Sequence, residues 1–538
     1  MSANQPPPLV DYNVFESDAP LRESFEREGA SWAHELVRDL GTLAGTQSAI
    51  DWGFQANANP PQLRTHDRFG NRIDEVEFHP AWHELLQVAV GHGLHAIPWR
   101  EPRPGAHVAR AAAFYIWSQV EGGHGCPVSM TYAAVPALRK QPDLAAHWEP
   151  LMTSLDYDPG LRPPSTKKGV LFGMAMTERQ GGSDVRANTT KATPAGADGE
   201  HLLTGNKWFC SAPMCDAFLV LAQAPGGLSC FLLPRVLPDG TRNGFHIERL
   251  KDKLGNRSNA SSEIALDNAW AVLIGEEGQG VKTIIEMVNH TRLDCVIGSA
   301  SLMRQAVAQA THHTAHRKAF GKLLSEQPLM VNVLADIAVE SEATTILMMR
   351  LARAFDASEH YFRRIGVALG KFWTCKRAID VVAEALECHG GNGYVEDSIL
   401  PRLYREAPLN SIWEGSGNVN ALDVLRAMQR EPATVDAYLD EVNLAKGQNR
   451  DFDRAIEELK SDMKNSSEME SQARRLVERM AIILEASLLL RFGDQIVAAL
   501  FINSRVSGDW GHTFGTLKTD PGFKSVIERH RPRLYGGG

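Results

Sequence analysis

The sequence has 538 residues, which is too long for one ordinary hydrophobic core, so we expect three or four domains. Hydrophobic residues make up 43% and charged residues 22%, which is the composition of an ordinary globular protein. The formal net charge of −9 excludes attraction of nucleic acid by the average field of the protein. Any contact with nucleic acid would need a local basic patch.

Cysteine usage and hydropathy argue against further classes of protein: disulfide-rich, zinc-binding, secreted and membrane proteins. The seven cysteines are odd in number, irregular in spacing and without a Cys-x-x-Cys motif, which favours reduced thiols in a cytoplasmic protein over disulfides or a zinc site. The N-terminal stretch lacks the basic start and apolar core of a secretory signal. The most apolar stretch, Met480 to Asn503, is interrupted by Glu485, Arg491 and Asp494, so we expect no membrane segment.

The first part of the chain, 1–172, is predicted to be a mainly helical domain with proline-rich breaks. Within it, the run from Val108 to Val120 is rich in alanine and aromatic residues and predicts a buried helix. From 173 to 282, short apolar runs are split by turn residues, which is the pattern of a small antiparallel β domain. Examples of these runs are Ala217–Ala222, Cys230–Leu233 and Glu263–Leu266.

From 281 onward the apolar residues follow a helical period, and long helices are predicted over 281–317, 328–356 and 361–389. A further helix is expected from about Gly417 to Gln429. Long helices with short links indicate a helical bundle over 283–430. Residues 431–538 are expected to form a helical C-terminal extension, whose apolar stripes are more typical of core than of function. The predicted fold class is therefore multidomain α with a central β domain.

Two segments of the β domain offer groups that suit a flat heterocycle. The sequence MTERQGGSD at 176–184 provides the hydroxyls of Thr177 and Ser183 and the backbone around two glycines. The sequence GNKWFCS at 205–211 places Phe209 near Ser211. Taken alone, the first segment is equally consistent with a plain turn, and the second is better explained as a strand with an aromatic core residue.

Two charged residues stand out in the helical region. Arg317 lies at a predicted helix end, shortly before Phe320, where it could pair with a phosphate, although most such arginines are simply solvated. Glu414 is the carboxylate of the segment IWEGSGN at 412–418. Apolar neighbours disfavour the charged form of a carboxylate, which suits proton abstraction next to a carbonyl. A helix N-terminal glutamate stabilised by the dipole explains the pattern equally well.

Together these segments resemble the acyl-CoA dehydrogenase family over about 173–430. The family has, in this order, a Met-Thr-Glu…Gly-Ser-Asp loop, Gly-x-Lys followed by an aromatic residue, Arg-x-x-Phe-Gly with a later Gln and Leu-Ala-Asp, Gly-Gly-x-Gly-Tyr, and a final Glu-Gly. The resemblance implies the acyl-CoA dehydrogenase fold: an N-terminal helical domain, a small antiparallel β domain and a C-terminal helical bundle, with FAD as cofactor. It also implies a homotetramer in which FAD is shared between subunits.

The resemblance also assigns site residues. Glu414 matches the general base of α,β-dehydrogenation, which removes the α-proton of an acyl-CoA while the β-hydrogen leaves as hydride to the flavin. In some branches the base lies on the first bundle helix, where the nearest carboxylate here is Asp294; it is off the family position and ranks below Glu414. The residues that match FAD-contacting positions are Met174, Met176, Thr177, Gly182, Ser183, Phe209, Cys210, Ser211, Arg317, Phe320, Gly390, Gly391, Ile412, Trp413, Gly415, Ser416 and Asn418.

Several strings and the long chain ends resemble the AidB-type branch of the family, which belongs to the adaptive response to DNA alkylation. The strings include NANPPQL at 57–63, FHPAWH at 78–83 and ERLKDKLGNRSNASSE at 248–263. The branch implies binding of double-stranded DNA, mainly through the C-terminal extension, and its protection in alkylation stress. Acidic and basic residues are interspersed there, so DNA would need a face that segregates its charges. The best candidates are Arg474, Arg475, Arg479, Lys524, Arg529, Arg531 and Arg533, although a charge run is usually a solvated face.

Three functions stay open at this point. The first is an AidB-type flavoprotein that binds DNA and has weak or specialised dehydrogenase activity on a short or branched acyl-CoA. The second is a metabolic acyl-CoA dehydrogenase or oxidase with no DNA role. The third is a DNA-binding shield with a structural flavin. The sequence identifies neither the acyl substrate nor the electron acceptor.

A metal site is not expected. His312, His313 and His316 lie on one predicted helix, and the first and last have i, i+4 spacing. No third ligand is evident nearby, so solvated histidines are the better interpretation.

Overall fold

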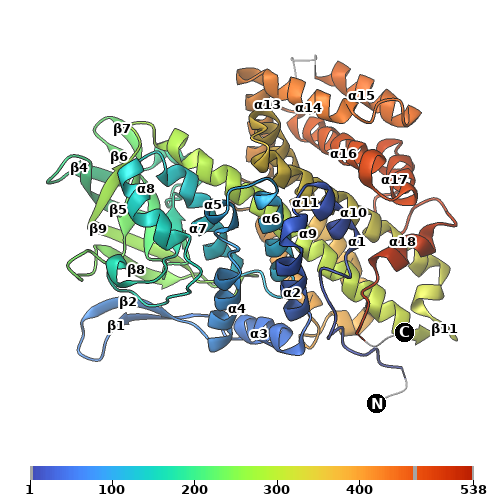
Figure 1. Cartoon of the computed structure of the whole chain (residues 1–538), viewed down its shortest axis with the longest axis horizontal. Helices are drawn as coiled ribbons and strands as arrows, with labels where there is room; N and C mark the ends of the chain where they lie inside the picture. The colour runs from blue at the N-terminus through green and yellow to red at the C-terminus, as the bar shows by residue number, and fades with distance from the viewer. Residues whose placement is uncertain (1–3, 464–468, 536–538) are drawn as a thin grey trace. The chain divides into compact units, whose positions relative to one another are not determined.

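The computed structural model describes residues 4–463 and 469–535 (Figure 1). The chain divides into two compact units, each assembled from segments that are separated in sequence. Unit 1 comprises Met1–Ile50, Arg103–Val120 and Arg292–Gly538, and unit 2 comprises Asp51–Pro102 and Glu121–Thr291. In the part of the chain that is described, no helix is long and apolar enough to cross a membrane.

Unit 2 is built on a seven-stranded sheet, most of which is green in Figure 1. Its strands are β3 (Phe172–Ala175), β4 (Lys191–Pro194), β5 (Glu200–Ser211), β6 (Ala217–Ala224), β7 (Gly227–Pro234), β8 (Phe245–Leu250) and β9 (Ser261–Ile274). The pairings β6–β4, β4–β5, β5–β9, β9–β7 and β7–β6 close into a ring. Most pairings are antiparallel, as predicted, but β3 and β4 both run parallel to β6.

Unit 2 also contains helices and a β-hairpin that is absent from the prediction for 1–172. The hairpin turn is closed by Asp67, whose Oδ1 accepts the amides of Phe69 (2.8 Å) and Asn71 (2.9 Å). The additional elements are β1 (Gln62–His66), β2 (Arg72–Glu77), α4 (Pro80–Gly91), α5 (Ile97–Arg100), α7 (Gly125–Leu138) and α8 (Pro142–Met152), with α3 (Gln47–Ala58) at the start.

Unit 1 contains the predicted helical bundle. The helices predicted at 281–317, 328–356 and 361–389 are confirmed as α9 (Gly280–His316), α10 (Pro328–Asp356) and α11 (His360–Cys388). The part of α9 from Arg292 onward belongs to this unit. The buried helix predicted near 108–120 is α6 (Ala106–Ser118), and the one expected from Gly417 is α13 (Gly417–Arg430). Further elements of this unit are α1 (Ala19–Arg27), α2 (His34–Ala44), β10 (Lys318–Ala319), β11 (Lys322–Leu323) and α12 (Leu400–Glu406).

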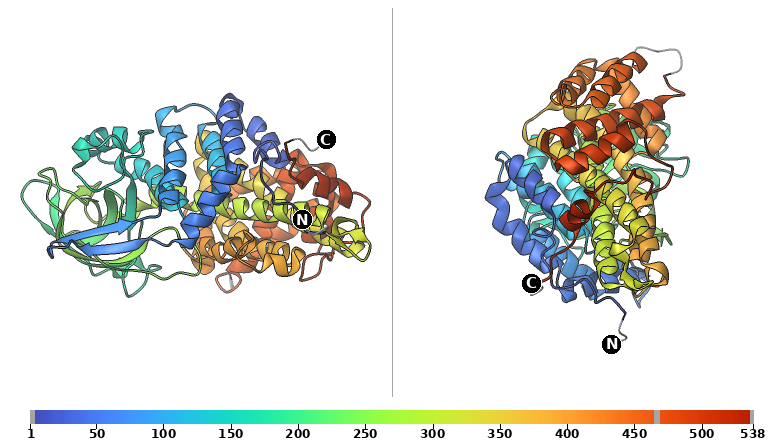
Figure 2. Two further views of the ribbon diagram at one scale, coloured as in Figure 1. Left: turned by 90° about the horizontal axis from the view of Figure 1, so that it is seen from below. Right: turned by 90° about the vertical axis from the view of Figure 1, so that its right-hand side faces the viewer.

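The C-terminal extension is helical and packs within unit 1 (Figures 1 and 2). Its elements are α14 (Ala433–Asn443), α15 (Arg450–Asp462), α16 (Ala473–Phe492), α17 (Gln495–Phe501), the π-helix η7 (Ile502–Val506) and α18 (Phe523–His530). α16 contacts α14 and α15 as well as α10, α11 and α13 of the bundle. The apolar stripes of the extension are buried, as the sequence predicts.

Buried ion pairs between side chains connect the C-terminal extension to α10. Arg505 in η7 has a fully buried side chain and pairs with Asp336 (2.5 Å) and Glu340 (3.0 Å). Arg529 of α18 pairs with Glu342 at 2.9 Å. A buried charge is tolerated only with a well-placed partner, so these pairs allow one arrangement of the extension on the bundle.

Another buried ion pair joins two motifs of the β domain. Glu178, just after β3, and Lys207 of β5 lie 2.8 Å apart, and neither side chain is exposed. Glu178 also accepts the amides of Thr189 (2.7 Å) and Thr190 (3.1 Å), while Lys207 donates to the carbonyl of Leu221 (2.7 Å). Burial by itself would raise the pKa of Glu178, but these hydrogen bonds lower it to about 2. The pair therefore stays ionised and holds the loop after β3 against β5.

We expect Glu178→Gln to destabilise the protein by about 3–5 kcal/mol at neutral pH, because the buried Lys207 ammonium loses its counter-charge. The folded-state pKa of Glu178, about 2, lies below its ordinary value of 4.5. Its stabilising contribution is therefore complete above pH 4.5 and is lost as the pH falls toward 2. Free energies of unfolding in urea, measured across this range, should show the gap between variant and wild type closing below pH 4.5.

Glu77→Gln is the matched control. Its carboxylate pairs with Arg64 at 3.0 Å on the surface, and exposed pairs contribute about 0–1 kcal/mol. If the gap for Glu178→Gln stayed constant as the pH is lowered to about 3, the buried pair would not be the origin of the effect.

Candidate functional site

The loop 176–183 follows β3 and is tied to the neighbouring strand. The amide of Trp208 donates to the carbonyl of Thr177 at 2.9 Å. Gly182 has no room for a side chain, because a Cβ there would lie 2.5 Å from Thr177 Oγ1. Gly182 and Ser183 are exposed. Three residues before them also match FAD-contacting positions of the family and are half-buried: Met174, Met176 and Thr177. The loop thus presents backbone and hydroxyl groups at the surface in a fixed conformation.

The end of β5 presents an aromatic surface. Phe209 is 52% exposed, and Lys251 Nζ lies 4.7 Å from its ring centroid and 3.6 Å from that of Trp208. Lys251 is held in turn by Glu263 at 2.5 Å. An exposed aromatic ring beside a positioned cation offers a flat face to a heterocyclic ligand.

Cys210 differs from its neighbours on β5. Its thiol is fully buried, and burial raises the pKa of Cys210 to about 12. Its carbonyl accepts the hydroxyl of Ser262 at 2.9 Å. The side chain of Ser211 is half-buried, with its hydroxyl 3.4 Å from that of Ser261. Of the three matched positions, Phe209 and Ser211 therefore reach the surface with their side chains, and Cys210 does not.

Glu414 stands on a sharp turn just before α13. Its φ of +57° and the φ of +98° at Gly415 place both residues in the left-handed region, which costs a non-glycine residue about 1–3 kcal/mol. The surroundings hold this conformation through the backbone. Arg292 Nε donates to the carbonyl of Glu414 (3.0 Å), while Lys371 Nζ and Asn420 Nδ2 each donate to that of Gly415 (2.5 Å).

The cations behind this turn are buried and are part of a larger network. Arg292 also pairs with Asp423 at 2.7 Å, and Arg364 pairs with the same carboxylate at 2.9 Å. Burial would raise the pKa of Asp423, but the two arginines lower it. No role was predicted from the sequence for either Lys371 or Arg292. The sequence did contain a clue to both residues. The helical period of α9 and α11 places these two charged side chains inside the bundle, where a charge needs a partner.

The lower-ranked alternative base, Asp294, serves another purpose. It is 6% exposed, and both its oxygens accept hydrogen bonds from the guanidinium of Arg110 in α6, one of them at 2.9 Å. A bidentate pair of this kind stabilises the charged carboxylate and fixes its position. Asp294 therefore joins α6 to α9 within unit 1.

Arg317 and the glycine-rich turn at 390–393 meet at the N-terminal segment. Arg317 Nη1 donates to the carbonyl of Asn4 (2.7 Å) and to Gln5 Oε1 (3.4 Å). The same Gln5 oxygen accepts a hydrogen bond from Asn392 Nδ2 (3.2 Å). The first two glycines of the turn, Gly390 and Gly391, are exposed, and a Cβ at either would meet nothing within 4 Å. Two motifs far apart in sequence are thus neighbours, with open space above the turn.

The other matched residues of unit 1 lie at the surface. Phe320 is 98% exposed at the tip of the β10–β11 hairpin, and Ile412 is 64% exposed. Trp413 is half-buried, with its indole N–H donating to Asn410 Oδ1 at 2.9 Å. Two further matched positions, at the start of α13, are exposed: Ser416 and Asn418.

Four of the seven basic candidates in the extension are exposed. Arg474, Arg475, Lys524 and Arg533 form no ion pair with any residue that the structure describes. Arg474 and Arg475 occupy the first turn of α16, where the helix dipole disfavours positive charge. Burial and the nearby charge of Arg474 lower the pKa of Lys376 on α11. Three basic side chains, Arg474, Arg475 and Lys376, are thus grouped at this end of α16, with Glu478 as a nearby carboxylate.

The other three basic candidates have carboxylate partners. Their charge is balanced within the fold, which leaves less of it for a phosphate. The pairs are Arg479–Glu458 (3.1 Å), Arg529–Glu342 (2.9 Å) and Arg531–Glu528 (2.7 Å). A DNA contact by any of the seven residues stays a prediction.

The expectation that the three histidines of α9 are solvated is wrong for two of them. His312 is 4% and His313 7% exposed, and their rings lie 4.5 Å from that of His316 and 4.4 Å from that of His389, respectively. Burial lowers the pKa of His312 and lowers that of His313 to about 3, so both are neutral. Among residues 4–463 and 469–535, no group of three or more His, Cys, Asp or Glu side chains is arranged to hold a metal ion.

Comparison with known proteins identifies the family. Three family models match in succession: the adaptive response protein AidB N-terminal domain over 4–159, the acyl-CoA dehydrogenase middle domain over 173–269 and the acyl-CoA dehydrogenase C-terminal domain over 278–429. AidB of Escherichia coli (strain K12) is 47% identical over 471 residues, which cover 86% of this chain and 87% of that protein. Acyl-CoA dehydrogenase family member 11 of Caenorhabditis elegans is 31% identical over 435 residues, or 77% and 70% of the two chains.

A solved structure agrees with this assignment. The crystal structure of Caenorhabditis elegans ACDH-11 in complex with C11-CoA matches with a TM-score of 0.86 at 27% identity, covering 98% of this chain and 92% of that one. The N-terminal helical, middle β and C-terminal helical parts are those of the acyl-CoA dehydrogenase fold. The chain therefore belongs to the AidB group of the acyl-CoA dehydrogenases, a family of FAD-dependent enzymes.

Proposed function

We propose that this acyl-CoA dehydrogenase binds double-stranded DNA and protects it in alkylation stress, and that it carries out weak or specialised α,β-dehydrogenation of a short or branched acyl-CoA. The catalytic part rests on one observation above all: buried cations fix the left-handed turn that presents Glu414. The DNA part is supported by the concentration of unpaired positive charge at the start of α16 and by the similarity to AidB.

The residues that match FAD-contacting positions suit different parts of the cofactor: those of unit 2 suit the flavin ring, and those of unit 1 suit the adenosine diphosphate. In unit 2, the exposed ring of Phe209 offers a flat face, and Thr177 and Ser183 offer hydroxyls beside accessible backbone. In unit 1, the open space above Gly390 and Gly391 leaves room for an adenosine diphosphate group. When bound, FAD supplies the two-electron acceptor for the β-hydrogen of the substrate.

Glu414 takes the α-proton in this proposal, through a carboxylate oxygen. The thioester carbonyl of an acyl-CoA acidifies that proton, and a positioned base completes its removal. Arg292 and Lys371 bind backbone carbonyls of the turn, so we assign them as positioning residues. They keep the backbone of the turn that carries the base in one place.

Glu414→Gln should slow flavin reduction by roughly 10²–10⁴-fold, because the α-proton then has no positioned acceptor. The measurement is an anaerobic titration of the FAD-loaded protein with straight and branched acyl-CoAs, including C11-CoA, monitored by flavin absorbance. We expect bleaching by one acyl class and its near loss in the variant. Asp440→Asn, an exposed carboxylate of α14, is the control and should bleach like the wild type.

Two results would count against the catalytic part. Bleaching of Glu414→Gln at the wild-type rate would place the base elsewhere. No bleaching of the wild type by any acyl-CoA, with FAD bound, would leave the flavin a structural role and favour DNA protection alone.

DNA binding is tested by its salt dependence. The double variant Arg474→Ala, Arg475→Ala should weaken binding to duplexes of any sequence and lower the slope of log K against log salt by about 2, since each phosphate contact contributes about 0.9. Arg454→Ala is the matched control, because this exposed arginine of α15 is already paired with Asp451 at 2.8 Å. A slope unchanged in the double variant would exclude this patch, and no binding by the wild type would favour the metabolic alternative without a DNA role.

We also infer a homo-oligomer, in keeping with the tetramer that the family resemblance implies. Phe320, Leu329 and Tyr394 of unit 1 are 98%, 83% and 81% exposed, and large apolar side chains left this open commonly mark interaction surfaces. Arg317, which also matches an FAD-contacting position, lies three residues before Phe320, at the start of the same hairpin. A second copy of the chain is the occupant that fits both observations.

Phe320→Asp should lower the molar mass measured by light scattering, because a charge replaces an apolar contact between copies. Phe69→Asp is the control: it is also an exposed phenylalanine (74%) at a hairpin tip, but in unit 2. A mass unchanged by Phe320→Asp, or lowered equally by both variants, would contradict the assignment of this surface.

A further inference from the structure

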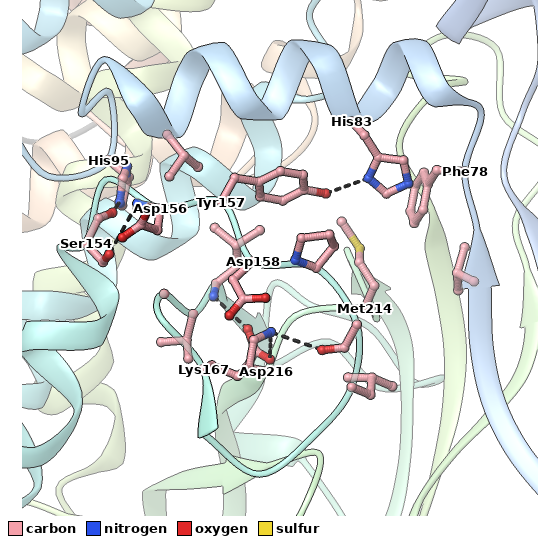
Figure 3. Close-up of a pocket in the computed structure, with 18 of the residues that line it drawn as sticks. Phe78, His83, His95, Ser154, Asp156, Tyr157, Asp158, Lys167, Met214 and Asp216 are labelled. Carbon is pink, nitrogen blue, oxygen red and sulfur yellow. Dashed lines mark hydrogen bonds and ion pairs between the residues drawn. The ribbon is translucent and has the colours of Figure 1, made fainter. Parts of the chain in front are cut away.

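Unit 2 contains a cavity of about 150 Å³ at the amino ends of β3 and β6 (Figure 3). Leu171, which precedes β3, and Asp216, which precedes β6, both line it. The flavin-matched loop follows the opposite end of β3, and this strand of four residues is roughly 13 Å long. The cavity is therefore separate from the residues proposed to bind FAD.

A buried ion pair forms part of the wall. Lys167 Nζ lies 2.6 Å from Asp216 Oδ1, and both side chains are almost fully buried. Lys167 also donates to the carbonyl of Gly160 (3.1 Å), while Asp216 Oδ2 accepts the amide of Leu171 (2.9 Å). An ammonium carries three N–H groups, and no third acceptor is found within the described part of the chain. The wall thus offers one spare donor beside a carboxylate with remaining acceptor capacity.

The other polar groups leave the interior of the cavity without net charge. The Tyr157 hydroxyl lies 2.8 Å from His83 Nδ1, and burial raises the pKa of Tyr157 and lowers that of His83, so both are neutral. Asp158 and Glu75 also line the wall, and each is paired with an arginine, Asp158 with Arg162 (2.5 Å) and Glu75 with Arg242. Asp156, at the exposed rim, adds negative charge only. An anion would therefore be repelled at the entrance and would find no net positive charge within.

The rest of the wall is apolar and aromatic. The ring of His83 lies 6.2 Å from that of Phe78 and 5.9 Å from that of Tyr157, so three rings follow one another along the cavity. Val90, Val170 and Met214 complete this part of the lining. A protein cavity of about this volume holds one benzene molecule. The space therefore suits a single six-membered ring, and ring–ring contacts favour an aromatic one.

We propose that this cavity binds a neutral, single-ring aromatic molecule that carries a hydroxyl or amide group. The oxygen of that group accepts the spare hydrogen bond of Lys167, and its O–H or N–H donates to Asp216. The ring packs among Phe78, Val90 and Met214. This binding site is additional to dehydrogenation and to DNA binding, and it involves none of the residues matched to FAD.

Phenol is the probe, added to the full-length, FAD-loaded protein and followed by titration calorimetry. We expect saturable binding of one phenol per chain with no change in the flavin spectrum. Toluene, of the same shape, should bind at least tenfold more weakly, because it leaves the Lys167 donor without an acceptor. Benzoate and benzylammonium should not bind, because each would introduce an uncompensated charge.

Met214→Trp fills the cavity and should weaken phenol binding at least tenfold. Met428→Trp changes a half-buried methionine of unit 1 in the same way and is the matched control. The proposal is overturned if phenol does not bind saturably, if toluene binds as tightly as phenol, if phenol shifts the flavin spectrum, or if folded Met214→Trp binds phenol like the wild type. The comparison of the four probes on wild-type protein does not depend on how well the variant folds.

Discussion

The ion pair between Glu178 and Lys207 is sealed from water, and the positions of both flavin-matched segments of the β domain depend on it. Glu178 belongs to the loop after β3, and Lys207 stands two residues before the exposed ring of Phe209. Because a buried charge without its partner is costly, neither segment can shift without the other. The placement of Phe209 relative to Thr177 is thus set inside the sheet, by residues that a cofactor would not touch.

Buried charges also fix the backbone near a candidate site residue in unit 1. Arg292 and Lys371 are buried, and they hold the backbone beneath Glu414 in a conformation that it would not adopt alone. In both units, buried charge restricts the backbone, while the side chains proposed to react or to contact a cofactor stay near the surface. Support and chemistry are therefore carried by different residues. Replacing a supporting residue changes stability and geometry together, whereas replacing Glu414 leaves the hydrogen bonds of its carbonyl in place.

Hydrophobic periodicity predicted the bundle to within one or two residues, because α9, α10 and α11 are long and consistently patterned. The β1–β2 hairpin was missed because its strands leave most side chains at least partly exposed and show no clean apolar alternation. Motifs predicted Glu414 and the flavin-matched loops as site residues, and these stay predictions, but no motif pointed to Lys371. The partner of a buried charge lies far away in the sequence, here 44 residues from Gly415, and no local pattern reveals it. The burial of His312 and His313 was also missed, because the residues that they contact, Pro7 and His389, lie far away in the sequence.

Unit 1 is assembled from both ends of the chain. Tyr12 forms a β-bridge with Leu534, and Arg529 pairs with Glu23. During synthesis the first fifty or so residues therefore leave the ribosome long before their partners exist, whereas the last residue of unit 2, Thr291, emerges with nearly half of the chain still to be made. It also follows that the C-terminal extension is not a detachable module. A chain cut after about residue 430 would lose Arg505 and Arg529, the partners of Asp336 and Glu342 on α10. Such a truncation would therefore report on the integrity of the bundle and not on what the extension binds.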